Sequence, residues 1–299
     1  AGENGIYIVI GWHAHGNPNT GETELDFYNP NLSLAKAALD AISKRYADNE
    51  WVLYDTLNEP AFISWKDWRP LAEKLTDVVL GNNPRAITLV SGVNWAHDLS
   101  GALSDPVKRK NIIYEVHAYP NNSNPSGAKW QDTVTKLSRK APVIIGEWGF
   151  DEHSAQHHLQ GNITNYAVPL VELANSLGIG WNAFIYSQSW QPHLVNFHNK
   201  KKEFLTDSGC FVREALNNRP YPNSAEWCNN SRVVAKFAKE KASAVSGKKL
   251  VYKKFSYVEH FSSEKYHHFH IKISDLSADG VVLPRDRSWR IALDDWRRR

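Results

Sequence analysis

Two glutamates close two strand-like apolar runs in this chain. Glu59 ends the run WVLYDTLNEP at residues 51–60, and Glu147 ends the run APVIIGEWGF at residues 141–150. A carboxylate beside a buried strand is costly unless it has a partner or a chemical task. Two of them on one chain therefore predict a pair that faces a common site. A facing pair of carboxylates is the arrangement that glycoside hydrolysis uses.

Other polar and aromatic residues follow the apolar runs at the same end. The carboxyl ends of barrel strands meet at one face, so these side chains are expected to gather around the two glutamates. The residues in question are His13, His15, Asn58, Glu59, Asn94, Trp95, His117, Tyr119, Glu147 and Trp190.

The elements that must position these residues alternate along the chain. Six short apolar runs have the composition of strands buried on both faces, and amphipathic segments lie between them. The alternation predicts a parallel α/β sheet. No run is followed by the glycine-rich turn of a nucleotide-binding fold, so a (β/α)8 TIM barrel is favoured. The predicted strands cover residues 6–12, 51–57, 86–93, 112–117, 142–147 and 179–186, and the predicted helices cover 34–46, 68–80, 130–137 and 166–177.

The overall composition narrows the choice of partners. The 299 residues carry a net charge of only +3, which does not favour a nucleic acid partner. The longest apolar runs are too short to span a membrane. Twelve tryptophans suit the flat apolar faces of sugars. Cys210 and Cys228 are the only cysteines, and a disulfide or two free thiols are both open.

The character of the sequence changes near residue 220. A helix is predicted at 233–245, and strands are predicted at 248–252 and 266–273. We therefore divide the chain into a barrel domain at 1–219 and an extension of unknown role at 220–299. Adjacent histidines on a strand point to opposite faces, so His267, His268 and His270 indicate a surface strand more than a metal site.

Four motifs, taken in order, resemble glycoside hydrolase family 5, the cellulase family of (β/α)8 retaining hydrolases. The resemblance covers roughly residues 5–215. It implies that Glu59 is the acid/base and Glu147 the nucleophile. The motifs are Gly11-Trp12-His13-Ala14-His15, Asn58-Glu59-Pro60, His117-Ala118-Tyr119 and Gly146-Glu147-Trp148-Gly149.

The resemblance also implies roles for residues around the pair. Asn58 would bind the sugar 2-hydroxyl, and Tyr119 would hold Glu147 through its hydroxyl. The side chains expected to line the sugar subsites are His13, His117, Phe184 and Trp190. The nearby charge of Glu147 is expected to raise the pKa of Glu59.

The chain departs from the family pattern in its first strands. Gly11 stands where the family usually has an aspartate. The family barrel has two further strands before residue 6, and the second ends in an arginine to which no residue here corresponds. We therefore expect an N-terminally incomplete barrel with weak or no activity, unless the extension covers the gap and protects the open edges.

The leading functional prediction is a secreted, retaining endo-β-1,4-glycanase that acts on β-glucan without a metal or cofactor. Two alternatives remain on the same fold, an inactive carbohydrate-binding fragment and a β-mannanase. A third alternative is a metal-dependent hydrolase that uses His13, His15 and His117. The sequence does not specify an oligomeric state.

Overall fold

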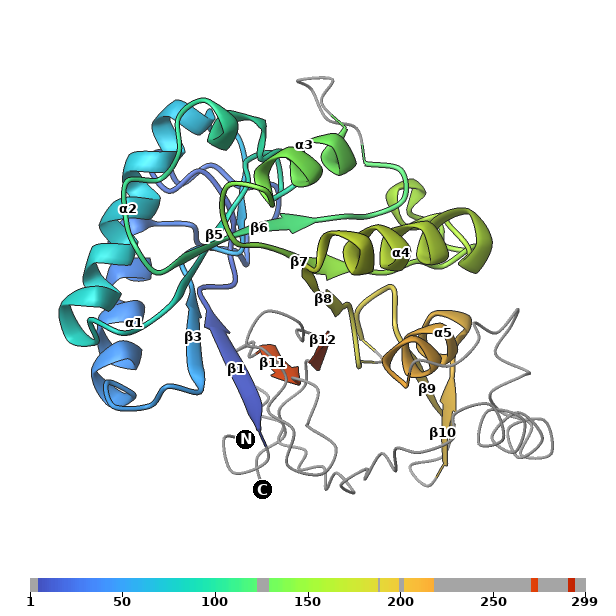
Figure 1. Cartoon of the computed structure of the whole chain (residues 1–299). Coiled ribbons are helices and arrows are strands. Elements are labelled where there is room, and N and C mark those ends of the chain that lie inside the picture. The colour runs from blue at the N-terminus through green and yellow to red at the C-terminus, as the bar shows by residue number, and fades with distance from the viewer. Residues whose placement is uncertain are drawn as a thin grey trace, which may run out of the picture.

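The computed structural model describes residues 5–122, 129–187, 189–198, 202–217, 270–273 and 290–293. Six parallel strands form one curved sheet in the order β1, β3, β5, β6, β7, β8. Every one of them lies within or beside a run that the sequence predicted, and the expected (β/α) barrel architecture is confirmed (Figure 1). The strands are β1 (Ile6–Gly11), β3 (Val52–Asp55), β5 (Thr88–Ser91), β6 (Ile112–His117), β7 (Val143–Trp148) and β8 (Gly180–Ala183).

Helices follow the strands and cover the outside of the sheet (Figure 1). The four helices predicted within residues 1–219 are present, and a fifth helix in this range was not predicted. Asn31 and Ser64 cap the first two helices through side-chain oxygens that accept backbone N–H groups. The helices are α1 (Leu32–Arg45), α2 (Trp65–Asn82), α3 (Trp130–Leu137), α4 (Val168–Leu177) and the unpredicted α5 (Asp207–Leu216), with short turns at Ser100–Leu103, His157–Leu159 and Ile163–Ala167.

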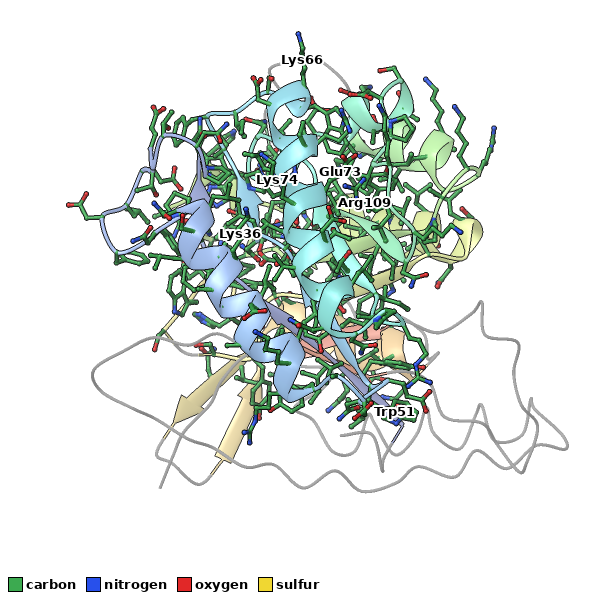
Figure 2. The ribbon with its side chains drawn as sticks, turned by 90° about the vertical axis from the view of Figure 1, so that its left-hand side faces the viewer. Lys36, Trp51, Lys66, Glu73, Lys74 and Arg109 are labelled. Carbon is green, nitrogen blue, oxygen red and sulfur yellow. The ribbon has the colours of Figure 1, made fainter. Side chains whose placement is uncertain are left out.

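The outer surface of α1 and α2 is charged. Figure 2 shows Lys36 on α1 together with Lys66 and Lys74 on α2. The guanidinium of Arg109 lies 3.6 Å from the carboxylate of Glu73, which is only 8% exposed. This contact links α2 to the loop before β6.

The barrel interior is built in layers. One layer is apolar and takes one residue from each of five neighbouring strands: Val9, Leu53, Leu89, Ile113 and Ile144. Alternation along a strand puts the residue two positions later on the same side. The next layer toward the carboxyl end is therefore polar, and it contains Gly11, Asp55, Ser91, Glu115 and Gly146.

Two further strands close the ring between β8 and β1. They are β11 (His270–Ile273) and β12 (Arg290–Leu293). β11 runs antiparallel to β1 and to β12, and β12 runs parallel to β8. The sequence predicted open sheet edges unless the extension covered them. Both edges of the six-stranded sheet are paired, β1 with β11 and β8 with β12. The strand predicted at 266–273 is confirmed in part, whereas the segments predicted at 233–245 and 248–252 lie outside the described residues.

Short paired segments complete the fold. β2 (His15–Gly16) runs parallel to β4 (Glu59–Pro60), and β9 (Val195–His198) pairs antiparallel with β10 (Lys202–Leu205). Cys210 on α5 is disulfide-bonded, and Cys228, the only other cysteine in the sequence, lies outside the described residues. No helix in the described part of the chain is long and apolar enough to cross a membrane.

Candidate active site

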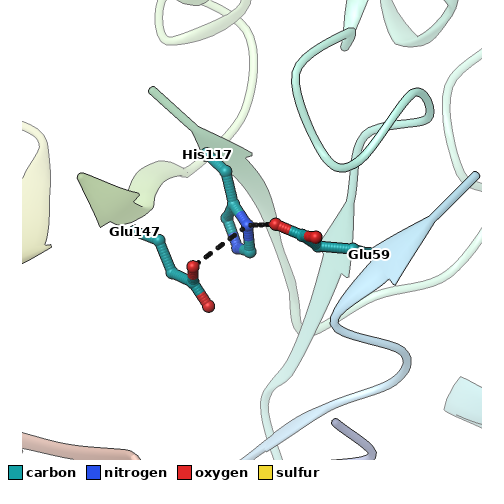
Figure 3. A group of neighbouring side chains, drawn as sticks. All are labelled: Glu59, His117 and Glu147. Atoms are coloured by element: carbon teal, nitrogen blue, oxygen red, sulfur yellow. Dashed lines mark hydrogen bonds and ion pairs between the residues drawn. The ribbon is translucent and has the colours of Figure 1, made fainter. Parts of the chain in front are cut away.

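Glu59, His117 and Glu147 meet at the carboxyl end of the barrel, on β4, β6 and β7 (Figure 3). His117 Nδ1 lies 2.6 Å from Glu59 Oε1 and 3.6 Å from Glu147 Oε2. One ligand atom from each of the three side chains lies within 4.8 Å of the other two. All three are buried, so the sequence-predicted carboxylate pair is brought together around an imidazole.

Glu59 is placed by the short pairing of β2 and β4. The register sets His15 directly opposite Glu59, and the Glu59 N–H donates to the Ala14 carbonyl at 3.1 Å. As a result, His15 Nε2 lies 3.2 Å from Glu59 Oε2. Glu59 therefore has one imidazole against each carboxylate oxygen, because His117 approaches the other one.

Glu147 is placed by β7 and by one hydroxyl. Tyr119 donates to Glu147 Oε2 at 3.0 Å, which is the contact that the sequence predicted. Among the described residues, Glu147 Oε1 has no hydrogen-bond partner although it is buried. A buried carboxylate oxygen without a partner costs free energy, which is typical of a reactive group.

The electrostatics of the pair are the reverse of the expectation. Burial alone would raise the pKa of Glu59, but the attraction of His15 and the hydrogen bond to His117 lower its pKa to about 2. Burial raises the pKa of Glu147 to about 7, against the opposing effect of His117. The predicted rise in the pKa of Glu59 is wrong because two imidazoles flank this carboxylate.

The cluster rests on the polar layer of the barrel. His117 Nε2 lies 3.9 Å from the buried carboxylate of Glu115. Three carboxylates around one imidazole raise the pKa of His117 well above its usual value, although burial by itself would lower it. His117 is therefore a buried cation that offsets the charge of the glutamates.

A cavity of about 580 Å³ opens above the cluster and shows where the other predicted residues lie. His13, Tyr119, Phe184 and Trp190 line it with the two glutamates. Asn58 is buried beside Glu59, and its Nδ2 lacks a hydrogen-bond partner among the described residues. A hollow of about 600 Å³ elsewhere, at residues 44–51 and Arg85, is a charged surface depression without a buried carboxylate pair.

The cavity also contains residues that the sequence did not assign to a sugar subsite. His15 stacks on Tyr28, with ring centroids 3.9 Å apart, and its Nδ1 lies 3.6 Å from Glu24 Oε1. Burial lowers the pKa of His97, which also lines the cavity, to about 4. The sequence pointed to His15 because it stands two residues after His13 in the same motif. Glu24 and Tyr28 lie in a loop whose sequence has no helical or strand periodicity, so no sequence signal pointed to them.

Glu59, His117 and Glu147 are also the described residues whose ligand atoms converge closely enough to consider a metal ion. The 2.6 Å contact between His117 and Glu59 is a direct hydrogen bond, with a proton between the two atoms. Two atoms that each lie about 2.0–2.2 Å from a tetrahedral metal ion are farther apart than the 2.6 Å of this contact, so the two side chains would have to separate before an ion could bind. The geometry favours an acid–base cluster.

Comparison with protein families gives one match over most of the chain. The family described as Cellulase (glycosyl hydrolase family 5) matches residues 1–189. Endoglucanase Z of Dickeya dadantii is 22% identical over 220 residues, which cover 73% of this chain and 47% of that protein. Endoglucanase A of Evansella cellulosilytica is 30% identical over 224 residues, which cover 71% of this chain and 43% of that protein. The chain thus spans less than half the length of these relatives.

Solved structures share the fold. The β-glucanase SdGluc5_26A of Saccharophagus degradans, in complex with cellotetraose, is 25% identical with a TM-score of 0.56, covering 64% of this chain and 62% of that one. The catalytic domain of alkaline cellulase K is 18% identical with a TM-score of 0.54, covering 72% of this chain and 70% of that one. The second likeness shows the barrel fold alone.

Proposed function

The chain belongs to glycosyl hydrolase family 5, and from this premise we propose that it is a retaining endo-β-1,4-glycanase acting on β-glucan of the cellulose type. In the proposal, Glu147 is the nucleophile and Glu59 the acid/base. These roles follow the order of the family motifs. The family match and the endoglucanases among its relatives support the substrate class.

One observation carries the proposed mechanism. A carboxylate oxygen of Glu59 and one of Glu147 lie within 4.8 Å of each other. Retaining glycosidases hold their carboxyl groups about 5–5.5 Å apart, whereas inverting enzymes need about 6.5–9.5 Å to admit a water molecule. The short separation supports attack by a carboxylate and a covalent glycosyl intermediate.

The proposed reaction has two steps. Glu147 attacks the anomeric carbon while a proton passes from Glu59 to the departing glycosidic oxygen. Water then attacks the glycosyl–Glu147 ester, and Glu59 takes its proton. Before substrate binds, the proton that Glu59 will donate lies on His117, because the pKa of His117 is raised. This proton must first move along the 2.6 Å hydrogen bond from His117 Nδ1 to Glu59 Oε1. His117 thereby positions and supplies the proton, and it remains hydrogen-bonded to Glu59.

The substrate is proposed to be an internal stretch of a β-glucan chain. Phe184 and Trp190 line the cavity and offer aromatic faces to a sugar ring. Asn58, next to Glu59 in the sequence, is buried and has a side-chain N–H group without a hydrogen-bond partner among the described residues. The solved complex of a similar β-glucanase contains cellotetraose, which supports a linear glucan as the ligand here. We also propose secretion, because such a polymer lies outside the cell and a disulfide-bonded cysteine fits an oxidising compartment.

Two azide experiments test the mechanism and the assignment of roles together. In Glu147→Gly, azide should enter from the face of the missing nucleophile and give the α-glycosyl azide. In Glu59→Ala, azide should attack the covalent intermediate and give the β-glycosyl azide. Early-time NMR of the wild-type product should show the retained anomer. Exchanged azide products would reverse the two roles, and an inverted wild-type product would refute the retaining mechanism.

A further inference from the structure

His15 presents each of its ring nitrogens to a carboxylate. Its Nε2 lies 3.2 Å from Glu59 Oε2, and its Nδ1 lies 3.6 Å from Glu24 Oε1. Nδ1 is buried and has no hydrogen-bond partner among the described residues. A buried polar atom without a partner needs a physical reason, such as a contact that is completed during the reaction. The facing carboxylate makes Glu24 the residue that can complete it.

The imidazole of His15 is constrained from two sides. It stacks on the buried ring of Tyr28, with centroids 3.9 Å apart and planes at 17°. The pairing of β2 with β4 sets the backbone of His15 opposite that of Glu59. Stacking fixes the plane of the ring but lets the ring slide within that plane. A directional hydrogen bond at Nδ1 therefore adds a constraint that stacking lacks.

Glu24 is tied to the cavity by a second contact. The indole N–H of Trp95 donates at 3.2 Å to Glu24 Oε1, the same atom that faces His15. Glu24 and Trp95 both line the cavity, and the Glu24 side chain is 43% exposed. A sugar in the cavity displaces water from this carboxylate, which strengthens its attraction for an imidazole N–H. Catalytic contacts are often long before substrate binds, so 3.6 Å is a distance that binding can shorten.

The carboxylate of Glu59 depends on its contacts for its orientation. The terminal torsion of a glutamate is broad, so the side chain itself does not fix the plane of the carboxylate. His117 holds Oε1 at 2.6 Å, and His15 faces Oε2. Loss of the second contact lets the carboxylate turn, and about 1 Å of misplacement can cost about 100-fold in rate.

We propose that Glu24 is a positioning residue for the acid/base: it accepts from His15 Nδ1–H and thereby keeps His15 Nε2 against Glu59 Oε2. The inference rests on the proposed function, because it requires that Glu59 protonates the leaving group. Glu24 acts through His15, so its removal impairs protonation of the leaving oxygen and not the attack by Glu147.

Two aryl β-cellobiosides separate these two events in the full chain. Phenoxide is a poor leaving group that needs a proton, whereas 2,4-dinitrophenolate departs without one. Glu24→Ala should lower kcat/KM about 10-fold on phenyl β-cellobioside and less than about twofold on the dinitrophenyl substrate. Glu24→Gln keeps a neutral oxygen acceptor, which forms weaker hydrogen bonds than a carboxylate, and should lose about 3-fold on the phenyl substrate. A purely structural role would affect both substrates alike.

Two further variants serve as controls. Asp26→Asn removes another exposed carboxylate from the same loop and should change neither value of kcat/KM. Trp95→Phe removes the indole donor to Glu24 and should leave the ratio of the two values as in the wild type.

The possible outcomes separate the inference from the proposed function. Equal losses on both substrates in Glu24→Ala, or no loss on either, would overturn the positioning role and leave the proposed function standing. A Trp95→Phe variant that reproduces the contrast would overturn the role by assigning the contrast to the indole. A wild-type chain that hydrolyses neither substrate would overturn the proposed function, and the inference with it.

Discussion

The two carboxylates differ in what surrounds them. Glu59 faces the imidazoles of His15 and His117, whereas Glu147 receives one hydroxyl from Tyr119. The pKa of Glu59 is therefore lowered, and that of Glu147 is raised to about 7. A nucleophile must be ionised, so the raised pKa of Glu147 places the acidic limit of the proposed activity near neutral pH.

Removal of the Tyr119 hydroxyl should shift that limit. The hydrogen bond from Tyr119 stabilises ionised Glu147 and lowers its pKa. In Tyr119→Phe the pKa of Glu147 should rise, so kcat/KM should start to fall at a higher pH as the solution is acidified. A shift of about one unit is expected from a charged hydrogen bond. The measurement is the pH profile of kcat/KM on cellotetraose. The control is Tyr7→Phe, which removes a tyrosine hydroxyl near the start of β1, where the ring of Tyr7 packs against Trp51. A shift to lower pH would contradict the assigned contact.

Chelation should leave the hydrolysis of β-glucan unchanged. The mechanism uses a proton between His117 and Glu59, and no step in it requires a metal ion. The initial rate is compared before and after dialysis against EDTA. A loss of activity that added Zn²⁺ restores would instead support the metal-dependent alternative with His13, His15 and His117.

Local sequence predicted which residues meet but not how they are charged. The Tyr119–Glu147 contact was predicted from the family motifs, and it forms because Tyr119 follows β6 by two residues while Glu147 lies near the end of the neighbouring strand β7. The position of His15 against Glu59 depends on the pairing of β2 with β4, two segments far apart in the chain. The sign of the pKa shift of Glu59 depends on that pairing, so it was not accessible from the motif.

At the scale of the strands, glycines make room for carboxylates inside the barrel. A Cβ at Gly11 would lie 2.7 Å from Asp55 Oδ2, and a Cβ at Gly146 would overlap the carboxylate of Glu115. Gly11 stands opposite Asp55 in the register of β1 and β3. The aspartate expected at position 11 in the family is therefore matched by a carboxylate that enters the same space from the next strand.

Gly11→Ala should test this complementarity. The added methyl must displace the Asp55 carboxylate, and overpacking of this kind costs about 1–3 kcal/mol of unfolding free energy. In the Asp55→Ala background the same change should cost less, which a double-mutant cycle with urea unfolding measures. Gly81→Ala in α2 meets no atom within 4 Å and should stabilise by about 0.5–1 kcal/mol. Equal costs in both backgrounds would refute the shared space.

The sequence predicted long periodic elements better than short ones. All six parallel strands and four helices lie where apolar periodicity placed them. The pair β2–β4 was missed because two residues carry no detectable period. The pair β9–β10 was missed because polar residues interrupt the apolar ones in both strands, unlike the continuous apolar runs of the predicted strands. Helix α5 was missed although Thr206 caps it by accepting the N–H of Gly209. It lies beyond the last strand that the sequence predicted for the barrel, at residues 179–186, and no helix was predicted between that strand and residue 233.

At the scale of the whole molecule, the ring is closed by the end of the chain. β1 is bounded by β3 on one side and by β11 on the other, and β8 is bounded by β7 and β12. Closure satisfies backbone groups that would otherwise be exposed at two sheet edges. The division of the chain at residue 219 stays a prediction, as does the weak activity expected of this chain, but β11 and β12 join the barrel itself.

Deletion of residues 218–299 should therefore destabilise the barrel and promote association. The deletion removes β11 and β12 and leaves the edges of β1 and β8 unpaired. We expect a melting temperature at least about 5 °C lower, since about 1 kcal/mol corresponds to about 2–4 °C in a protein of this size.

Circular dichroism measures the melting temperature, and size-exclusion chromatography with light scattering measures the association. The deletion also removes Cys228, so the full chain with both Cys210→Ser and Cys228→Ser is the control. It shows how far the melting temperature falls when the disulfide alone is lost. A truncated chain that stays monomeric and melts like this cysteine variant would show that the two strands add nothing to the barrel.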